Sequence, residues 1–316
     1  GFDGFFMHAR AGIEIPYCGE EWFAACETAI LEAEKLGMTA WIYDEDGWPS
    51  GFAGGKIPEL GEDYQAKHLC FTNKFPKRNV LAAYRKTAEG KFTHIDVKDS
   101  REGDYYIYYE TVPHYVDLLN PEVTREFIKV THEIYKQRFS NWFGNVIKGV
   151  FTDEPQLIGR FPYTFAFPEQ YKNRFGADFL DNAWQLFIDG EGAKRFRYTY
   201  WKLVSSLFEQ SFTKQIADWC SENGILMTGH FSNEDGLCNQ VKSNGDLLSH
   251  YTHMQAPGID HLGNRLASPV LLKQVGDAAY IHNKPMVLSE SFGCAGWDAS
   301  FSDLAWITHW QSCFGV

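Results

Sequence analysis

The chain has 316 residues, a formal net charge of −12 and 22% charged residues. A chain of this length can bury a sizeable core, and a single α/β barrel commonly takes about 250 residues. The acidic balance and the lack of a Lys/Arg-rich run argue against a nucleic-acid partner. No apolar stretch approaches the length needed to cross a bilayer, so we expect no membrane partner.

The first half of the chain shows strand and helix patterns in alternation, interrupted once. Apolar periodicity predicts a strand, a helix and a strand, then short alternating segments that form a small antiparallel β insertion, then a helix. Gly37 stops the first helix, and Asn120 and Pro121 begin the second. These elements cover 5–9, 19–36, 38–43, 56–115 and 121–139.

The second half continues the alternation after an aromatic-rich segment, 161–187, that we expect to be irregular. The expected elements are a strand ending at Asp153 and Glu154, a helix over 192–223, a strand over 225–231, a further helical stretch, a strand near 250–254 that leads to 257–260, a helix over 271–282, a strand ending at Glu290 and a helix over 302–314. This gives about six strands outside the insertion. We therefore expect one domain over 1–316, an α/β fold of the (β/α)8 TIM-barrel type that lacks a strand at each end. The chain would then be a fragment of a longer enzyme.

The seven cysteines are scattered and form no CxxC pair. This pattern predicts reduced thiols and a cytoplasmic location, although the start inside a strand-like run without Met leaves an upstream signal peptide as an alternative. No dinucleotide or phosphate-loop motif is present, so we expect no organic cofactor.

Two glutamates stand where apolar strands end. Glu154 closes the run 146–154 before Pro155, and Glu290 closes a second run between Ser289 and Ser291. Chemistry in barrel enzymes collects at the carboxyl ends of the strands, and glycoside hydrolysis needs one carboxyl as acid and another as base or nucleophile. The pair is therefore predicted to be catalytic. Alternatively, Asp153 and Glu154 cap the next segment or pair with Arg10.

Further polar and aromatic residues fall at the same predicted rim. Histidines near strand ends indicate substrate binding, with zinc as an alternative that no HExxH spacing supports. Three consecutive acids after the strand over 38–43 could bind hydroxyls or a divalent cation such as calcium, or form a solvated loop. Glu234 and Asp235 could replace Glu290 as the base. The substrate-binding candidates are His8, Arg10, Asp44, Asp46, Trp48, Asp153, His230, Glu234, His253 and Trp297, and the calcium candidates are Asp44 and Glu45.

Four motifs, in this order, resemble the catalytic barrel of glycoside hydrolase family 106-like proteins, which include α-L-rhamnosidases. They are Phe5-Phe-Met-His-Ala-Arg-Ala-Gly12, Trp41-Ile-Tyr-Asp-Glu-Asp-Gly-Trp-Pro-Ser-Gly-Phe-Ala-Gly-Gly55, Phe151-Thr-Asp-Glu-Pro155 and Leu288-Ser-Glu-Ser-Phe-Gly293. The resemblance implies an inverting hydrolase with flanking domains, a calcium ion near the sugar and Glu154 as general acid. Glu290 matches a late-strand glutamate and would act as the base.

We therefore expect a glycoside hydrolase that cleaves a terminal sugar, an α-L-rhamnoside, with a carbohydrate as its binding partner. One alternative is a retaining glycosidase of the β-galactosidase type, in which the second carboxylate acts as nucleophile. The other is a carbohydrate-binding barrel that has lost catalysis.

Overall fold

The computed structural model describes residues 2–10 and 12–316 and contains a curled, open parallel sheet with the form of a half-barrel. Its six strands lie in the order β1-β2-β7-β9-β10-β11, and every neighbouring pair is parallel. Their bounds are β1 (Gly4–Met7), β2 (Thr39–Tyr43), β7 (Ile147–Asp153), β9 (Leu226–His230), β10 (Ala256–His261) and β11 (Leu288–Ser291). Five of these strands were expected from the sequence. The other was expected near 250–254, but most of that segment belongs to the helix α8 (Leu247–His253), and β10 follows it. The closed eight-stranded barrel stays a prediction.

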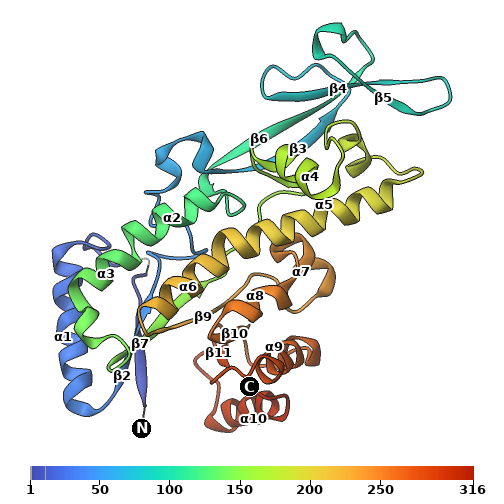
Figure 1. Ribbon diagram of the computed structural model, residues 1–316. Helices are drawn as coiled ribbons and strands as arrows, with labels where there is room; N and C mark the ends of the chain where they lie inside the picture. Colours follow the sequence, from blue (N-terminus) through green and yellow to red (C-terminus); the bar gives the residue numbers. More distant parts are fainter. Residues whose placement is uncertain (1, 11) are drawn as a thin grey trace.

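Helices connect and cover these strands (Figure 1). They are α1 (Glu20–Leu36), α2 (Pro121–Val130), α3 (His132–Phe139), α5 (Ala193–Phe208), α6 (Lys214–Glu222), α7 (Leu237–Asn244), α8 (Leu247–His253), α9 (Pro269–Ile281) and α10 (Phe301–Cys313). In α1 the buried residues recur at helical spacing, from Trp22 and Phe23 through Cys26 and Ile30 to Ala33. None of the helices in the described ranges is long and apolar enough to cross a membrane.

Two predicted helices are broken. The segment 121–139 divides at Thr131, whose backbone angles (φ −121°, ψ −80°) are not helical. Its N-terminus matches the expectation, since Pro121 occupies the first turn and the Asn120 side chain accepts a hydrogen bond from the Glu122 N–H group at 3.1 Å. The segment 192–223 passes through a π-helical turn, η6 (Glu209–Thr213), which separates α5 from α6. Such turns insert one residue into the helical repeat, which fits the five-residue step from Leu207 to Phe212 in the apolar pattern.

A second sheet, antiparallel and five-stranded, has the order β5-β4-β6-β3-β8. Figure 1 shows its outer part around β4 and β5 projecting away from the parallel sheet, with α4 (Phe167–Phe175) and α5 beside the sheet. The strands are β3 (Gln65–Thr72), β4 (Val80–Lys86), β5 (Phe92–Ile95), β6 (Tyr105–Val116) and β8 (Pro162–Tyr163), and the short helices next to them are η1 (Pro58–Leu60), η2 (Glu62–Tyr64) and η3 (Val97–Asp99). A further short helix, η4 (Ser140–Trp142), follows α3 and precedes β7.

The aromatic segment expected to be irregular is partly ordered into regular elements. It contributes β8, the helix α4 (Phe167–Phe175) and the 3-10 turn η5 (Ala183–Leu186). Its rings pack on the antiparallel sheet, where Phe187 stacks on Phe71 with ring centroids 5.3 Å apart and Trp184 stacks on Phe92 at 4.8 Å. Many of the aromatic side chains are therefore core residues of this second layer.

One close backbone approach fixes the parallel sheet beside the rim. Gly229 in β9 has φ of +129°, and a Cβ atom there would lie 1.9 Å from the Thr152 carbonyl oxygen of β7. Only glycine combines this backbone angle with such a contact. The ends of β7 and β9 are therefore held against each other one residue before Asp153 and His230.

Candidate active site

The carboxyl ends of four neighbouring strands bring together one cluster of ionisable side chains. In the register of the sheet Asp153 lies opposite His230, and Asp260 lies opposite Glu290. Glu154 follows β7 directly, and its N–H group donates to the His230 carbonyl oxygen at 3.2 Å. The cluster therefore forms because residues at equal depth in adjacent parallel strands reach the same edge of the sheet.

His230 is the centre of the cluster. Its Nε2 atom lies 2.9 Å from Oε2 of Glu290 and 3.4 Å from Oδ1 of Asp153, and the side chain is 1% exposed. Burial alone would lower the pKa of the imidazole, but the hydrogen bond to Glu290 and the charges of Glu234, Asp153 and Asp260 outweigh it and raise the pKa to about 9. His230 is therefore a buried imidazolium at neutral pH, with carboxylates on several sides.

Glu154 and Glu290 have opposite electrostatic surroundings. Burial raises the pKa of Glu154, and the negative charges of Asp153 and Glu290 raise it further, although the charge of His230 opposes this. The hydrogen bond from His230 lowers the pKa of Glu290. The surroundings thus shift Glu154 toward the protonated form and Glu290 toward the ionised form, which are the directions that an acid and a base require.

The backbone at Glu154 is unusual. Its φ angle is 45°, in the left-handed region that residues other than glycine, asparagine and aspartate seldom occupy. The strand direction therefore ends at Asp153, and the glutamate side chain leaves the sheet on a turned backbone. Residues held in such conformations concentrate at functional sites.

Asp260 is part of the cluster and was missed in the sequence. One ligand atom each from Glu154, His230 and Asp260 lies within 4.8 Å of the others. Burial, together with the charges of Glu290, Glu154 and Asp153, raises the pKa of Asp260 to about 7, against the opposing charge of His230. The segment 257–260 was noted in the sequence but was expected to follow a strand near 250–254, so Asp260 was not recognised as a residue at a strand end.

A cavity of about 190 Å³ opens beside Glu154 and Asp260. Its lining is mainly polar and comes from the loops after β7, β9 and β10, the end of β10 and the start of α9. The other lining residues are Phe231, Asn233, Glu234, Asp235, His261, Leu262, Arg265, Leu266, Ala267, Ser268 and Leu271. Concave, polar space at the strand ends is the usual location of a ligand site in parallel α/β proteins.

Asp153 is held by a network on the other side of His230. The Tyr43 hydroxyl donates to Oδ2 of Asp153 at 2.5 Å, and the Ser50 hydroxyl accepts from the Asp153 N–H group at 2.7 Å. Ser50 in turn donates to Oδ1 of Asp44 at 2.6 Å. The His8 ring stacks on Tyr43 with centroids 3.5 Å apart, and burial lowers the pKa of His8 to about 4. Asp153 and Asp44 are thus buried in hydrogen-bonded positions, and His8 is neutral.

The buried Glu45 carboxylate accepts hydrogen bonds from the backbone of the loop that follows β2. Oε1 accepts hydrogen bonds from the N–H groups of Asp46 and Gly54 at 2.9 and 2.6 Å, and Oε2 accepts from three further N–H groups at 2.7–3.2 Å. These three are the N–H groups of Gly51, Phe52 and Ala53. A calcium ion needs free oxygen ligands, whereas these oxygens face the positive ends of N–H dipoles. The surroundings of Glu45 therefore do not fit the calcium site expected at Asp44 and Glu45.

Several predicted binding residues are exposed in the segments that follow β1, β2 and β11. Asp46 is exposed, Trp48 is 52% exposed, and the Arg10 guanidinium lies 5.3 Å from the centre of the Trp48 ring. Trp297, in the loop after β11, is fully exposed. The Arg10 cation lies over one face of the exposed Trp48 indole, which leaves the other face of this ring available for contact.

Two predicted binding residues contact other parts of the chain. His253 is the last residue of α8 and precedes β10, so it lies toward the amino end of that strand, where Nε2 contacts Oε1 of Glu209 at 2.7 Å. The strand-end placement expected for His253 was wrong, because the preceding helix extends through it. Glu234 lines the cavity but is 4% exposed, and its two oxygens accept from the Phe231 and Asp260 N–H groups and the Tyr251 hydroxyl at 2.9–3.1 Å. Glu234 thus shapes the loop after β9.

Comparisons with known proteins give a structural relationship. No protein-family model matches the chain, and no curated protein matches its sequence. A solved structure of a rhamnosidase from Novosphingobium sp. PP1Y is similar, with a TM-score of 0.56 and 18% sequence identity. The match covers 73% of this chain and 24% of that chain, so the present chain corresponds to less than a third of the rhamnosidase. At this level of identity the similarity shows a shared fold.

Proposed function

We propose that this protein is the catalytic region of a glycoside hydrolase that removes a terminal α-L-rhamnose with inversion. In this proposal Glu154 protonates the glycosidic oxygen, and Glu290 removes a proton from the attacking water. The sugar is suggested by the four motifs that resemble family 106-like proteins and by the fold shared with a rhamnosidase. Carbohydrate is accordingly the proposed substrate class.

The opposite pKa shifts of Glu154 and Glu290 around one histidine carry this proposal. An acid and a base that operate at the same pH need environments that push their pKa values apart. The His230 imidazolium stabilises the ionised form of Glu290, whereas burial stabilises the protonated form of Glu154. His230 positions Glu290 through a hydrogen bond and is not itself required to exchange a proton.

Sugar binding is assigned to the rim. Trp48 and Trp297 offer exposed aromatic faces, and Arg10 offers donors for hydroxyl groups. Sugar rings present apolar C–H faces that pack on aromatic rings, while their hydroxyls need charged or polar partners. Asp46 is exposed in the same loop as Trp48 and is proposed to accept hydroxyl hydrogen bonds.

The experiment compares nitrophenyl glycosides with natural disaccharides. The purified protein should hydrolyse p-nitrophenyl α-L-rhamnoside faster than the other sugars of the panel. Glu154→Gln should lose activity by roughly 100-fold or more on a disaccharide and much less on the nitrophenyl substrate, whose leaving group needs little protonation. Glu290→Gln should lose activity on both substrates.

Exposed Glu59 provides the matched control, since Glu59→Gln makes the same chemical change away from the strand ends. Equal loss on both substrates in Glu154→Gln would remove Glu154 as the acid. Proton NMR of the first-formed sugar distinguishes inversion from the retaining mechanism. Binding of the sugars without any hydrolysis would instead support the carbohydrate-binding barrel.

A further inference from the structure

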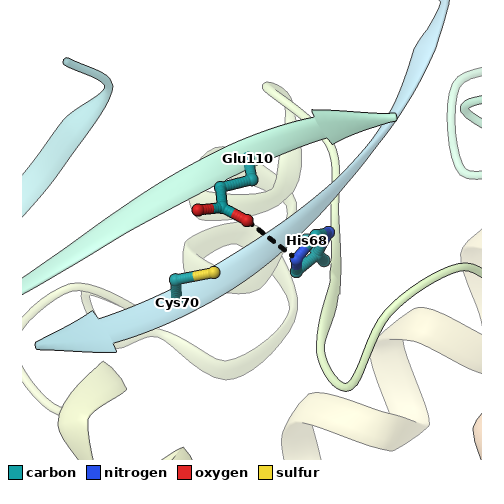
Figure 2. Close-up of side chains that lie close together, drawn as sticks. All are labelled: His68, Cys70 and Glu110. Atoms are coloured by element: carbon teal, nitrogen blue, oxygen red, sulfur yellow. Dashed lines mark ion pairs between the residues drawn. The ribbon is translucent and has the colours of Figure 1, made fainter. Parts of the chain in front are cut away.

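A second group of metal-ligating side chains lies on the antiparallel sheet, outside the candidate active site. His68 and Cys70 are on β3, and Glu110 is on β6 (Figure 2). Side chains two residues apart in a strand point to the same face of the sheet, and His68 and Glu110 are directly paired across the two strands. Cys70 is paired with Tyr108 in the next position on that face. The sheet therefore presents imidazole, thiol, carboxylate and phenol side by side.

The spacing of these groups differs from that of a hydrogen-bonded pair. One ligand atom from each of His68, Cys70 and Glu110 lies within 4.8 Å of the other two. Nε2 of His68 is 3.6 Å from Oε2 of Glu110, which is too long for a hydrogen bond. In a tetrahedral site with zinc–ligand bonds of about 2.0–2.3 Å, neighbouring ligand atoms lie roughly 3.3–3.7 Å apart. The observed separation matches that value.

The backbone holds His68 in place. Gly159 lies over it, and a Cβ atom on Gly159 would be 2.5 Å from Cβ and Cγ of His68. On the same strand the Leu69 N–H group donates to the Phe161 carbonyl oxygen at 2.8 Å, and Pro162 of β8 is paired with His68. The histidine thus sits between β6 and the segment 159–162. A ligand whose position is fixed by surrounding backbone needs little rearrangement to bind a metal.

We propose that His68, Cys70 and Glu110 bind a zinc-class divalent transition-metal ion. Nitrogen, sulfur and oxygen donors together are typical of zinc, whereas calcium and magnesium select oxygen donors alone. The three residues leave a fourth position of the tetrahedron. A water molecule or the Tyr108 hydroxyl, which lies 3.4 Å from Oε1 of Glu110, would occupy it.

The site is accessible to an ion from solvent. The His68 side chain is 22% exposed and that of Glu110 53% exposed, while Cys70 is partly buried. The ion would join β3 to β6 beside the segment that leads back to Glu154. This proposal is independent of the glycosidase assignment, because none of its ligands belongs to the strand-end cluster.

Metal binding is tested with metal-free protein titrated with zinc by calorimetry and with cobalt by absorption spectroscopy. One ion per chain should bind, and cobalt should give the near-ultraviolet charge-transfer band of a thiolate ligand. Cys70→Ser should abolish the band, and His68→Gln and Glu110→Gln should weaken zinc binding by more than about 100-fold, since loss of outer partners alone costs 10–100-fold. Circular dichroism of each variant verifies folding.

Matched controls use residues of the same types elsewhere in the chain. Cys238→Ser changes an exposed thiol, and His94→Gln removes the histidine that pairs with Asp181 at the other end of the sheet. Both should bind zinc as the unmodified protein does. Absence of stoichiometric binding would overturn the proposal. So would binding that survives Cys70→Ser and His68→Gln but is lost in His230→Gln, because the ion would then lie at the strand-end cluster.

Discussion

Nε2 of His230 donates to Oε2 of Glu290 at 2.9 Å, although β10 separates the strands that carry the two residues. The imidazole therefore reaches across one strand to the carboxylate, and Asp260 of the intervening strand lies in the same cluster. Because the histidine is buried, its contact with Glu290 is little screened by water. The charge state of this one side chain controls several neighbouring carboxylates.

His230→Gln is expected to shift the pH dependence of hydrolysis. Without the imidazolium the pKa of Glu290 rises from its lowered value, so the acidic limb of kcat/KM should move to higher pH. Activity near pH 7 should fall by roughly 10- to 100-fold. This loss is smaller than the full rate enhancement of general acid–base catalysis, because Glu290 itself is still present. The measurement is a pH profile on the preferred nitrophenyl glycoside. His94→Gln should leave the profile unchanged, and an unchanged acidic limb in His230→Gln would contradict the positioning role.

Stability should decrease as pH rises from 6.5 to 9. The folded state raises the pKa of His230 from 6.5 to about 9, so it binds this proton more tightly than the unfolded chain. The protonated histidine therefore adds up to about 3 kcal/mol to the free energy of unfolding. This stabilisation is fully present below about pH 6.5 and is lost as pH rises through 9. Urea unfolding at pH 6 and pH 9.5 measures it. His230→Gln should flatten the slope in this window, and a variant that retains the full slope would exclude His230 as its source.

Asp260→Asn should raise the melting temperature at pH 8 while it lowers activity. The pKa of Asp260 is raised to about 7, so its favourable contribution to stability is present below about pH 4 and is lost as pH rises through 7. At pH 8 the ionised carboxylate opposes folding by about 1–2 kcal/mol, allowing for its partial exposure. Asp235→Asn, at an exposed position of the same cavity, should change the melting temperature little. A lower melting temperature for Asp260→Asn at pH 8 would contradict the raised pKa.

Glu45→Gln should destabilise the protein by about 2–4 kcal/mol. The carboxylate accepts five backbone N–H groups, and an amide NH2 group in place of one oxygen would face N–H donors without an acceptor. The loop that carries Trp48 should loosen with it. Thermal unfolding and tryptophan fluorescence measure both effects. Glu59→Gln is the matched exposed control. A Glu45→Gln variant as stable as this control would show that the Glu45 carboxylate does not stabilise the loop.

Strand ends were predictable from the sequence, but their lateral arrangement was not. Apolar runs that stop at polar residues indicated where β7 and β11 end, which gave Glu154 and Glu290. Whether two ends meet depends on sheet order and register, and these are set by long-range packing. Asp260 was therefore overlooked, although it lies opposite Glu290 in the register.

The sequence also did not predict the direction in which each side chain points where several polar residues follow one another. Asp44, Glu45 and Asp46 are consecutive acids with three different environments. The first is buried and accepts a hydrogen bond from a hydroxyl group, the second accepts hydrogen bonds from loop N–H groups, and the third is exposed. Only the path of the loop backbone decides which carboxylate meets N–H groups. His253 shows the same limit, since its polarity fits either end of a strand and only the length of α8 places it.

The left-handed backbone of Glu154 implies a conflict between two kinds of selection. A side-chain-bearing residue in this region costs about 1–2 kcal/mol that glycine would not. Laboratory evolution for heat resistance alone would thus favour Glu154→Gly and discard the carboxylate. Selection for sugar release would instead keep the glutamate. The residue found at position 154 after selection would therefore show whether stability or activity had been selected.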